Sequence, residues 1–209
     1  MLNILLVDDH AIMRKGLKEV LVEGLGQVEV GEAATGREAL EAVRKQAWDA
    51  VVLDVNLPDK NGIEVLKEMK ALRPALPVIV LSLHPEDQYA VRMLKAGAAG
   101  YLTKESAPEQ LVAAVRKALE GGKYVSAALA EQLATGLGTP SAEPLATLSD
   151  REMEVLCLIA GGKTPTDIAD TLALSIKTIS TYRARLLEKL KLKTTADLIR
   201  YALDHKLVE

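Results

Sequence analysis

The chain has 209 residues, a formal net charge of −3, 49% hydrophobic and 26% charged residues. These fractions are typical of a globular protein and exclude disordered, collagen-like and coiled-coil chains. The apolar runs near the N-terminus are far shorter than the roughly 20 residues of a membrane span. Asp8 and Asp9 interrupt the first run before it resembles a signal peptide, and the single Cys157 excludes a disulfide framework. We therefore expect a cytoplasmic protein with no membrane partner.

Charge divides the chain into an acidic part and a locally basic part. Residues 1–122 carry 15 basic and 18 acidic side chains. Residues 146–209 carry 10 and 9, and the segment 177–193 alone has a net charge of +5. Gly, Pro and Ser cluster between the two parts, which is typical of a linker. We predict a first domain over 1–122, a linker over 123–145 with one candidate short helix near Ser126–Leu133, and a second domain over 146–209.

The first part alternates short apolar runs with amphipathic stretches five times. The runs are Ile4–Val7, Val28–Val30, Ala50–Leu53, Val78–Leu81 and Tyr101–Leu102. After each run, apolar residues recur three and four positions apart, which indicates a helix. Apolar strands separated by helices favour a parallel sheet that is covered on both faces. We predict a flavodoxin-like, doubly wound, five-stranded α/β domain that binds ligands beyond the carboxyl ends of its strands.

The second part contains no strand pattern, and four helices can be placed in it. Helix starts are indicated by Ser149 with its capping-box partner Glu152, by Thr164 before a proline, by Ser175, and by Thr194 or its neighbour. The two middle helices are joined by a tight turn, which is typical of a helix-turn-helix. We predict a small all-α domain of four helices with this motif at its centre.

Polar side chains follow four of the five predicted strands and should meet at one edge of the sheet. They are Asp8, Asp9, Asp54, Ser82 and Lys104. Three carboxylates repel one another unless a hard cation such as Mg²⁺ binds them. With a lysine and a serine beside them, they favour phosphate chemistry on a carboxylate nucleophile. Each aspartate taken singly is more often a cap or turn residue, and we interpret the nearby Asp59 as such a cap.

These residues lie in segments that resemble a known family. The segments that resemble a response-regulator receiver are Leu5-Leu6-Val7-Asp8-Asp9-His10, Val51-Val52-Leu53-Asp54-Val55-Asn56-Leu57-Pro58 with Gly62, Leu81-Ser82, and Gly97-Ala98-Ala99-Gly100-Tyr101-Leu102-Thr103-Lys104. The segment from Leu148-Ser149 to Lys189-Leu190 resembles a LuxR-type helix-turn-helix. The order resembles the NarL/FixJ family of two-component regulators, over nearly the whole chain except the linker.

The resemblance implies a phosphoacceptor and a metal site. Asp54 would accept a phosphoryl group from a histidine kinase, and the protein would catalyse only its own phosphorylation and dephosphorylation. Asp9 and Asp54 would hold Mg²⁺, with Asp8 helping directly or through water and Asn56 through its backbone carbonyl.

The same resemblance assigns roles to the ends of the last two strands. Ser82 and Lys104 would bind the phosphoryl oxygens, and Tyr101 would reorient as Ser82 moves. From the residues alone, Tyr101 could equally be a half-buried core residue. Glu105 follows Lys104 where many receivers carry proline and a cis bond, so the geometry of this loop departs from the pattern. His10 has no partner at helical spacing and is interpreted as a loop histidine.

The helix predicted over residues 176–190 has an apolar and a basic side. The apolar side, expected to face the core, holds Ile176, Ile179, Leu186, Leu187 and Leu190. The other side favours contacts with double-stranded DNA, in the groove and at the phosphates, from Lys177, Thr178, Ser180, Thr181, Arg185, Lys189, Lys191 and Lys193. Composition alone would favour a solvated surface helix. Because a small lone domain makes few contacts, we expect a homodimer, with Leu198 and Tyr201 as its seam.

Two other functions remain open. A Mg²⁺-dependent phosphohydrolase resembling the haloacid dehalogenases would need a second aspartate two residues after Asp54, where the chain has Asn56. A receiver that binds only proteins would use the second domain for dimerisation and would not shift DNA. We predict a DNA-binding transcriptional regulator in which phosphorylation of Asp54 promotes dimerisation and promoter binding.

Overall fold

The computed structural model describes residues 1–82, 86–127, 129–131, 144–172, 174–205 and 207–208. The chain divides into two compact units, Met1–Leu133 and Ala134–Glu209, each described here by itself. The predicted domain limits at 122 and 146 stay predictions. Part of the candidate short helix near Ser126–Leu133 and most of the predicted linker lie outside the described residues. His84 also lies outside them.

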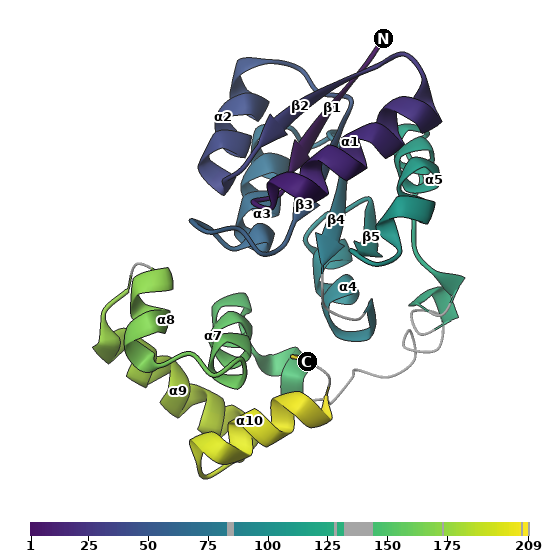
Figure 1. Ribbon diagram of the computed structural model, residues 1–209. Helices are drawn as coiled ribbons and strands as arrows, with labels where there is room; N and C mark the ends of the chain where they lie inside the picture. Colours follow the sequence, from purple (N-terminus) through teal and green to yellow (C-terminus); the bar gives the residue numbers. More distant parts are fainter. Residues whose placement is uncertain (83–85, 128, 132–143, 173, 206, 209) are drawn as a thin grey trace. The chain divides into compact units, whose positions relative to one another are not determined.

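The first unit is a parallel five-stranded sheet with helices on both faces (Figure 1). Its strands run in the order β2-β1-β3-β4-β5 and are β1 (Leu2–Val7), β2 (Val28–Ala33), β3 (Ala50–Asp54), β4 (Val78–Ser82) and β5 (Gly100–Thr103). Its helices are α1 (Ala11–Leu25), α2 (Gly36–Lys45), α3 (Gly62–Leu72), α4 (Glu86–Lys95) and α5 (Ala107–Leu119). The predicted flavodoxin-like, doubly wound α/β fold is confirmed.

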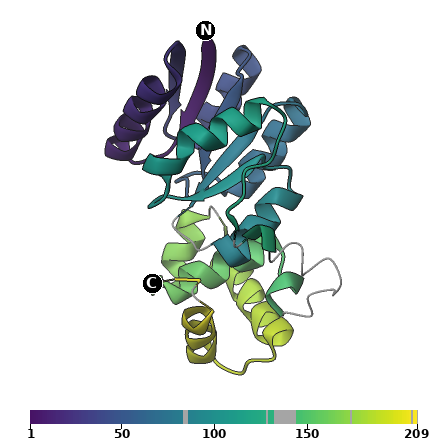
Figure 2. The ribbon, with the colours of Figure 1, turned by 90° about the vertical axis from the view of Figure 1, so that its right-hand side faces the viewer.

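The core of this unit lies on both faces of the central strands. Helices α1 and α5 pack side by side on one face (Figure 2), and α2 and α3 pack together on the other. Every residue of β3 and β4 is buried, because both faces of these strands are covered. The apolar runs that predicted the strands therefore form the core, and polar side chains occur only where these strands end.

The second unit is helical. After a 3₁₀ turn (Pro144–Thr147) it contains α7 (Asp150–Ala160), α8 (Pro165–Thr171), α9 (Ile176–Leu190) and α10 (Thr195–Asp204). The side chains of Ser149, Thr164, Ser175 and Thr194 each cap one helix, so the four predicted helix starts are confirmed. None of the helices in the described part of the chain has the length and apolar character that a membrane span requires.

Two predictions about the helical unit are wrong. Ile176, expected in the core, is 51% exposed, because it lies in the first turn of α9 at a groove that Ile168 and Ile179 also line. Leu198, expected at an exposed seam, is fully buried in α10, a helix that packs on α7 and α9. Tyr201 is half-buried, and its ring stacks on that of His205 at 4.0 Å.

A close approach in the first unit gives a test of the fold. A Cβ atom at Gly31 in β2 would lie 2.2 Å from Cη2 of Trp48, whose indole Nε1 donates to the carbonyl of Ala42. Gly31→Ala should therefore lower the free energy of unfolding by about 1–3 kcal/mol through overpacking. In α1, a Cβ atom at Gly16 meets nothing within 4 Å, so Gly16→Ala should instead raise stability by about 0.5–1 kcal/mol.

Urea unfolding followed by the fluorescence of Trp48 measures both variants, because this single tryptophan lies in the first unit. Equal stability of Gly31→Ala and the wild type would contradict the packing of Trp48 against β2.

Candidate functional site

The carboxyl ends of four neighbouring strands bring polar side chains together at one edge of the sheet. Asp8 directly follows β1, Asp54 ends β3, Ser82 ends β4, and Lys104 directly follows β5. Asp8, Asp54 and Ser82 are fully buried, and Lys104 is 6% exposed. Because β1, β3, β4 and β5 are adjacent in this order, the sheet places together the residues that the sequence predicted at this edge.

The Lys104 ammonium lies between two of the buried carboxylates. Its Nζ donates to Oδ2 of Asp54 at 2.7 Å and forms an ion pair with Oδ2 of Asp8 at 2.8 Å. The backbone N–H of Lys104 donates to the carbonyl of Ser82 at 2.7 Å, which fixes the chain after β5 beside the end of β4. The side chain of Lys104 thus holds two carboxylates, while its backbone is tied to the strand that carries Ser82.

Burial and ion pairing shift the pKa of Asp54 in opposite directions, and the same holds for the pKa of Lys104. Burial raises the pKa of Asp54 to about 6, although the hydrogen bond from Lys104 and that from the backbone N–H of Asn56 oppose the shift. Burial also lowers the pKa of Lys104, but its contacts with Asp54 and Asp8 outweigh this effect, so the net shift is upward. Asp54 is therefore ionised at neutral pH, and Lys104 stays charged.

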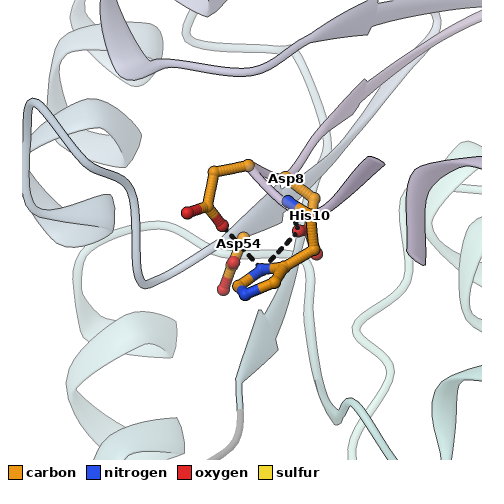
Figure 3. A group of neighbouring side chains, drawn as sticks. Asp8, His10 and Asp54 are labelled. Carbon is orange, nitrogen blue, oxygen red and sulfur yellow. Dashed lines mark hydrogen bonds and ion pairs between the residues drawn. The ribbon is translucent and has the colours of Figure 1, made fainter. Parts of the chain in front are cut away.

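The open side of the cluster is formed by Asp9 and His10. Oδ1 of Asp8 accepts from the backbone N–H of His10 at 2.7 Å, and the His10 imidazole turns toward Asp8 (Figure 3). Nδ1 of His10 is 2.7 Å from Oδ1 of Asp9, whose side chain is 34% exposed. One ligand atom from each of Asp8, Asp9, His10 and Asp54 lies within 4.8 Å of the others.

This cluster fits a divalent cation. Its three carboxylates and the Lys104 ammonium leave a net charge of −2, and carboxylate oxygens are the preferred ligands of Mg²⁺. Oδ2 of Asp8 is buried and, apart from its ion pair with Lys104, has no hydrogen-bond partner within the described residues. The cluster thus offers a metal both the balancing charge and carboxylate oxygens that are held close together.

The remaining predicted site residues lie next to this cluster. The backbone N–H of Asn56 donates to Oδ1 of Asp54 at 3.0 Å, which places Asn56 at the site, while metal binding by its carbonyl stays a prediction. The Tyr101 side chain is fully buried in β5 rather than half-buried, and its reorientation also stays a prediction. The described residues contain no cis peptide bond, so Glu105 follows Lys104 in trans.

Sequence reasoning missed two contacts of this edge. His10 was interpreted as a loop histidine, but its ring lies at the carboxylates. Asp59 was interpreted as a solvated cap, and it does cap a helix, but that helix is α2: it accepts from the backbone N–H groups of Gly36 and Arg37 at 2.7 and 3.0 Å. No spacing signal could reveal this cap, because 22 and 23 residues separate the partners.

In the helical unit, α9 presents a polar and basic surface. The exposed residues among the predicted DNA contacts are Lys177, Ser180, Thr181, Arg185 and Lys189 on α9, and Lys191 and Lys193 directly after it. Thr178 is half-buried, and its hydroxyl lies 2.8 Å from that of Ser175. Arg183, which the helical wheel left without a role, donates to Oγ1 of Thr195 and so connects α9 to α10. The name α9 surface is used below for the exposed predicted DNA contacts listed above, without Lys189.

Lys189 differs from its neighbours on α9. Its Nζ forms an ion pair with Oε2 of Glu152 at 2.7 Å, and Glu152 is only 3% exposed. The same carboxylate oxygen accepts from the backbone N–H of Ser149 at 2.7 Å and completes the capping box of α7. Lys189 therefore has a partner inside the helical unit in place of the predicted phosphate contact.

The raised pKa of Asp54 gives a prediction for the metal-free chain. Folding holds a proton on Asp54 up to about pH 6, whereas the ordinary pKa is 3.8. The unfolded state therefore releases this proton first, and the wild type loses stability as the pH rises from about 4 to 6. Asp54→Asn has no such loss, so its stability relative to the wild type should rise over this range by up to about 3 kcal/mol.

Urea unfolding with a chelator present, followed by Trp48 fluorescence between pH 4 and 7, measures this difference. Asp49→Asn is the matched control, because Asp49 is exposed and an asparagine oxygen can still accept from the backbone N–H of Asn3. A stability difference between Asp54→Asn and the wild type that does not change with pH would contradict the burial of an ionisable Asp54.

Comparison with known families matches both units. Residues 4–116 match the response regulator receiver domain, and residues 146–202 match the bacterial regulatory proteins of the luxR family. Response regulator UvrY of Escherichia coli strain K12 is 34% identical over 209 residues, which cover 99% of this chain and 96% of UvrY. Response regulator GacA of Pseudomonas aeruginosa is 35% identical over 211 residues, which cover 100% of this chain and 99% of GacA.

Solved structures of RcsB from Salmonella show the same architecture. One RcsB structure has a TM-score of 0.76 at 28% identity and covers 98% of both chains. Another, of RcsB bound to the promoter rprA with the phosphomimetic BeF₃⁻, has a TM-score of 0.71 at 28% identity and covers 96% of this chain and 98% of that chain. With its receiver unit followed by a LuxR-type helix-turn-helix, the chain belongs to the NarL/FixJ family of two-component response regulators, which are not classical enzymes.

Proposed function

We propose that this chain is a cytoplasmic, DNA-binding transcriptional regulator that accepts one phosphoryl group on Asp54 from a sensor histidine kinase. The observation that carries the proposal is the contact of Lys104 with Asp54 and Asp8 at the carboxyl edge of the sheet. This contact supports a site that combines a nucleophile, a fixed cation and a divalent metal. Residues 1–122 act as the receiver, 123–145 as the linker and 146–209 as the DNA-binding domain.

The transfer step uses the buried carboxylate as nucleophile. An oxygen of Asp54 attacks the phosphorus of the kinase phosphohistidine, a P–O bond forms, and the P–N bond breaks with its electron pair on the histidine nitrogen. Mg²⁺, when bound, neutralises charge on the phosphoryl oxygens. This ion would be held by Asp8, Asp9, Asp54 and the backbone carbonyl of Asn56. Like other regulators of its kind, the chain catalyses only its own phosphorylation and dephosphorylation.

Modification rearranges the contacts of Lys104. A phosphoryl group on Asp54 adds about 1.5 to 2 negative charges, and it competes with Asp8 for the Lys104 ammonium. The Ser82 hydroxyl donates to a second phosphoryl oxygen, and Tyr101 reorients as Ser82 moves. Because the backbone N–H of Lys104 is bonded to Ser82, both strand ends respond together. The altered face then favours pairing of two receivers, and the homodimer brings two helical units to DNA.

The α9 surface supports the DNA-binding part of the proposal. Its exposed side chains combine cations with small hydroxyl groups, which suits phosphate and base-edge contacts. Lys177, Thr178, Ser180, Thr181 and Arg185 face the groove, and Lys191 and Lys193 contact phosphates. RcsB, to which this chain is similar, has been solved bound to a promoter, which supports DNA binding by this chain.

Phosphorylation is tested on the full-length chain with acetyl phosphate and Mg²⁺. Intact mass spectrometry should show one added phosphoryl group on the wild type and on Asp49→Asn, and none on Asp54→Asn, because an amide oxygen is a poor nucleophile. Undiminished labelling of Asp54→Asn would refute the assignment.

DNA binding is tested with a matched pair of lysines and a random-sequence duplex. Lys191→Ala should reduce the slope of log affinity against log salt by about 0.9 for the phosphate contact it removes. Lys189→Ala should leave this slope unchanged, because its ammonium is engaged by Glu152. Instead it should lower the free energy of unfolding by about 1–3 kcal/mol, since Glu152 then stays buried without its partner. Equal slopes for Lys191→Ala and the wild type would argue against phosphate binding by Lys191.

A further inference from the structure

A nitrogen ligand lies among the oxygens of the carboxylate cluster. Nδ1 of His10 is 2.7 Å from Oδ1 of Asp9 and 3.2 Å from Oδ1 of Asp8. Figure 3 shows the His10 ring turned toward the carboxylates rather than away from them. A single ion could therefore contact Nδ1 of His10 together with carboxylate oxygens of Asp8, Asp9 and Asp54, because one ligand atom of each residue lies within 4.8 Å of the others.

The backbone holds His10 in this place. His10 is the N-cap residue of α1, with extended φ and ψ of −84° and 103°, and its side chain makes no capping hydrogen bond. Its N–H donates to Asp8, and its carbonyl accepts from the N–H of Arg14 in the first turn of α1. A typical N-cap side chain would turn back to the helix. The His10 ring instead extends to the buried Asp8, whose Oδ1 lies 3.2 Å from Nδ1 of His10 and whose Oδ2 is paired with the Lys104 ammonium.

We propose that Nδ1 of His10 is a metal ligand, which increases the preference of the receiver site for first-row transition ions such as Co²⁺ or Zn²⁺ over Mg²⁺. This inference rests on the metal site of the proposed function. Mg²⁺ prefers oxygen ligands and gains little from an imidazole, whereas the later first-row ions bind imidazole nitrogen well.

Coordination requires the neutral imidazole with its proton on Nε2. Coordination uses the lone pair of Nδ1, so any proton on this atom leaves to solvent when the ion binds. The His10 side chain is 63% exposed, which lets water accept this proton. The ring then replaces its hydrogen bond to Asp9 by a bond to the ion, and Oδ1 of Asp9 becomes available to the same ion.

Metal titration of the full-length chain tests this assignment. Affinities for Mg²⁺, Co²⁺ and Zn²⁺ are measured by calorimetry for the wild type and for His10→Ala, with His205→Ala in the helical unit as the matched control. His10→Ala should lower the affinity for Co²⁺ and Zn²⁺ by about tenfold or more relative to that for Mg²⁺. His205→Ala should bind all three ions as the wild type does. His10→Asn separates ligation from capping, because asparagine is a good N-cap residue but lacks the imidazole.

A direct readout comes from long-range ¹⁵N–¹H spectra of the histidine rings with Zn²⁺. The Nδ1 signal of His10 should shift to the position of a coordinated nitrogen, and the signals of His205 should not move. An unshifted His10 ring in the Zn²⁺-saturated chain, or equal loss of Mg²⁺ and Co²⁺ affinity in His10→Ala, would overturn the inference. Failure of the wild type to bind Mg²⁺ at all would instead refute the metal site of the proposed function.

Discussion

The Lys104 ammonium between Asp54 and Asp8 is the interaction on which the rest of the receiver depends. Two carboxylates buried at adjacent strand ends would repel each other in a medium of low dielectric constant, and neither could stay ionised without a partner. Lys104 supplies that partner from a third strand, so β1, β3 and β5 must end at the same level of the sheet. The doubly wound fold makes this possible, because all five strands are parallel and end on one edge.

The same interaction prepares the site for chemistry at a cost in stability. Burial keeps the Asp54 carboxylate away from water and raises its pKa, while Lys104 holds it ionised at neutral pH. A cluster with a net charge of −2 favours a divalent cation, and a phosphoryl group would add the charge that draws Lys104 away from Asp8. The burial of charge that raises the pKa of Asp54 therefore also favours the binding of a metal and of a phosphoryl group.

The helical unit also contains a buried carboxylate that is paired with a lysine. Glu152 is buried at the start of α7 and is held by Lys189 near the end of α9 and by the backbone of Ser149. In each unit, then, a buried carboxylate is paired with a lysine from a distant element. The difference lies in the surroundings. Glu152 has its own lysine and a capping box, whereas Asp8 shares the Lys104 ammonium with a second buried carboxylate, Asp54.

The amino-acid sequence by itself determined the elements and the composition of the site. Apolar runs predict buried strands and Ser or Thr caps predict helix starts, because both depend on interactions between near neighbours, and Asp54 and Lys104 follow from their places at strand ends. Tertiary structure alone decided which side chains meet across long separations. Leu198 is buried because α10 packs on its neighbouring helices, and Lys189 pairs with Glu152, which lies 37 residues away in the sequence. His10 joins the carboxylates because the turn after β1 places its ring beside them. Such contacts depend on how elements pack, and spacing along the chain carries no signal of that packing.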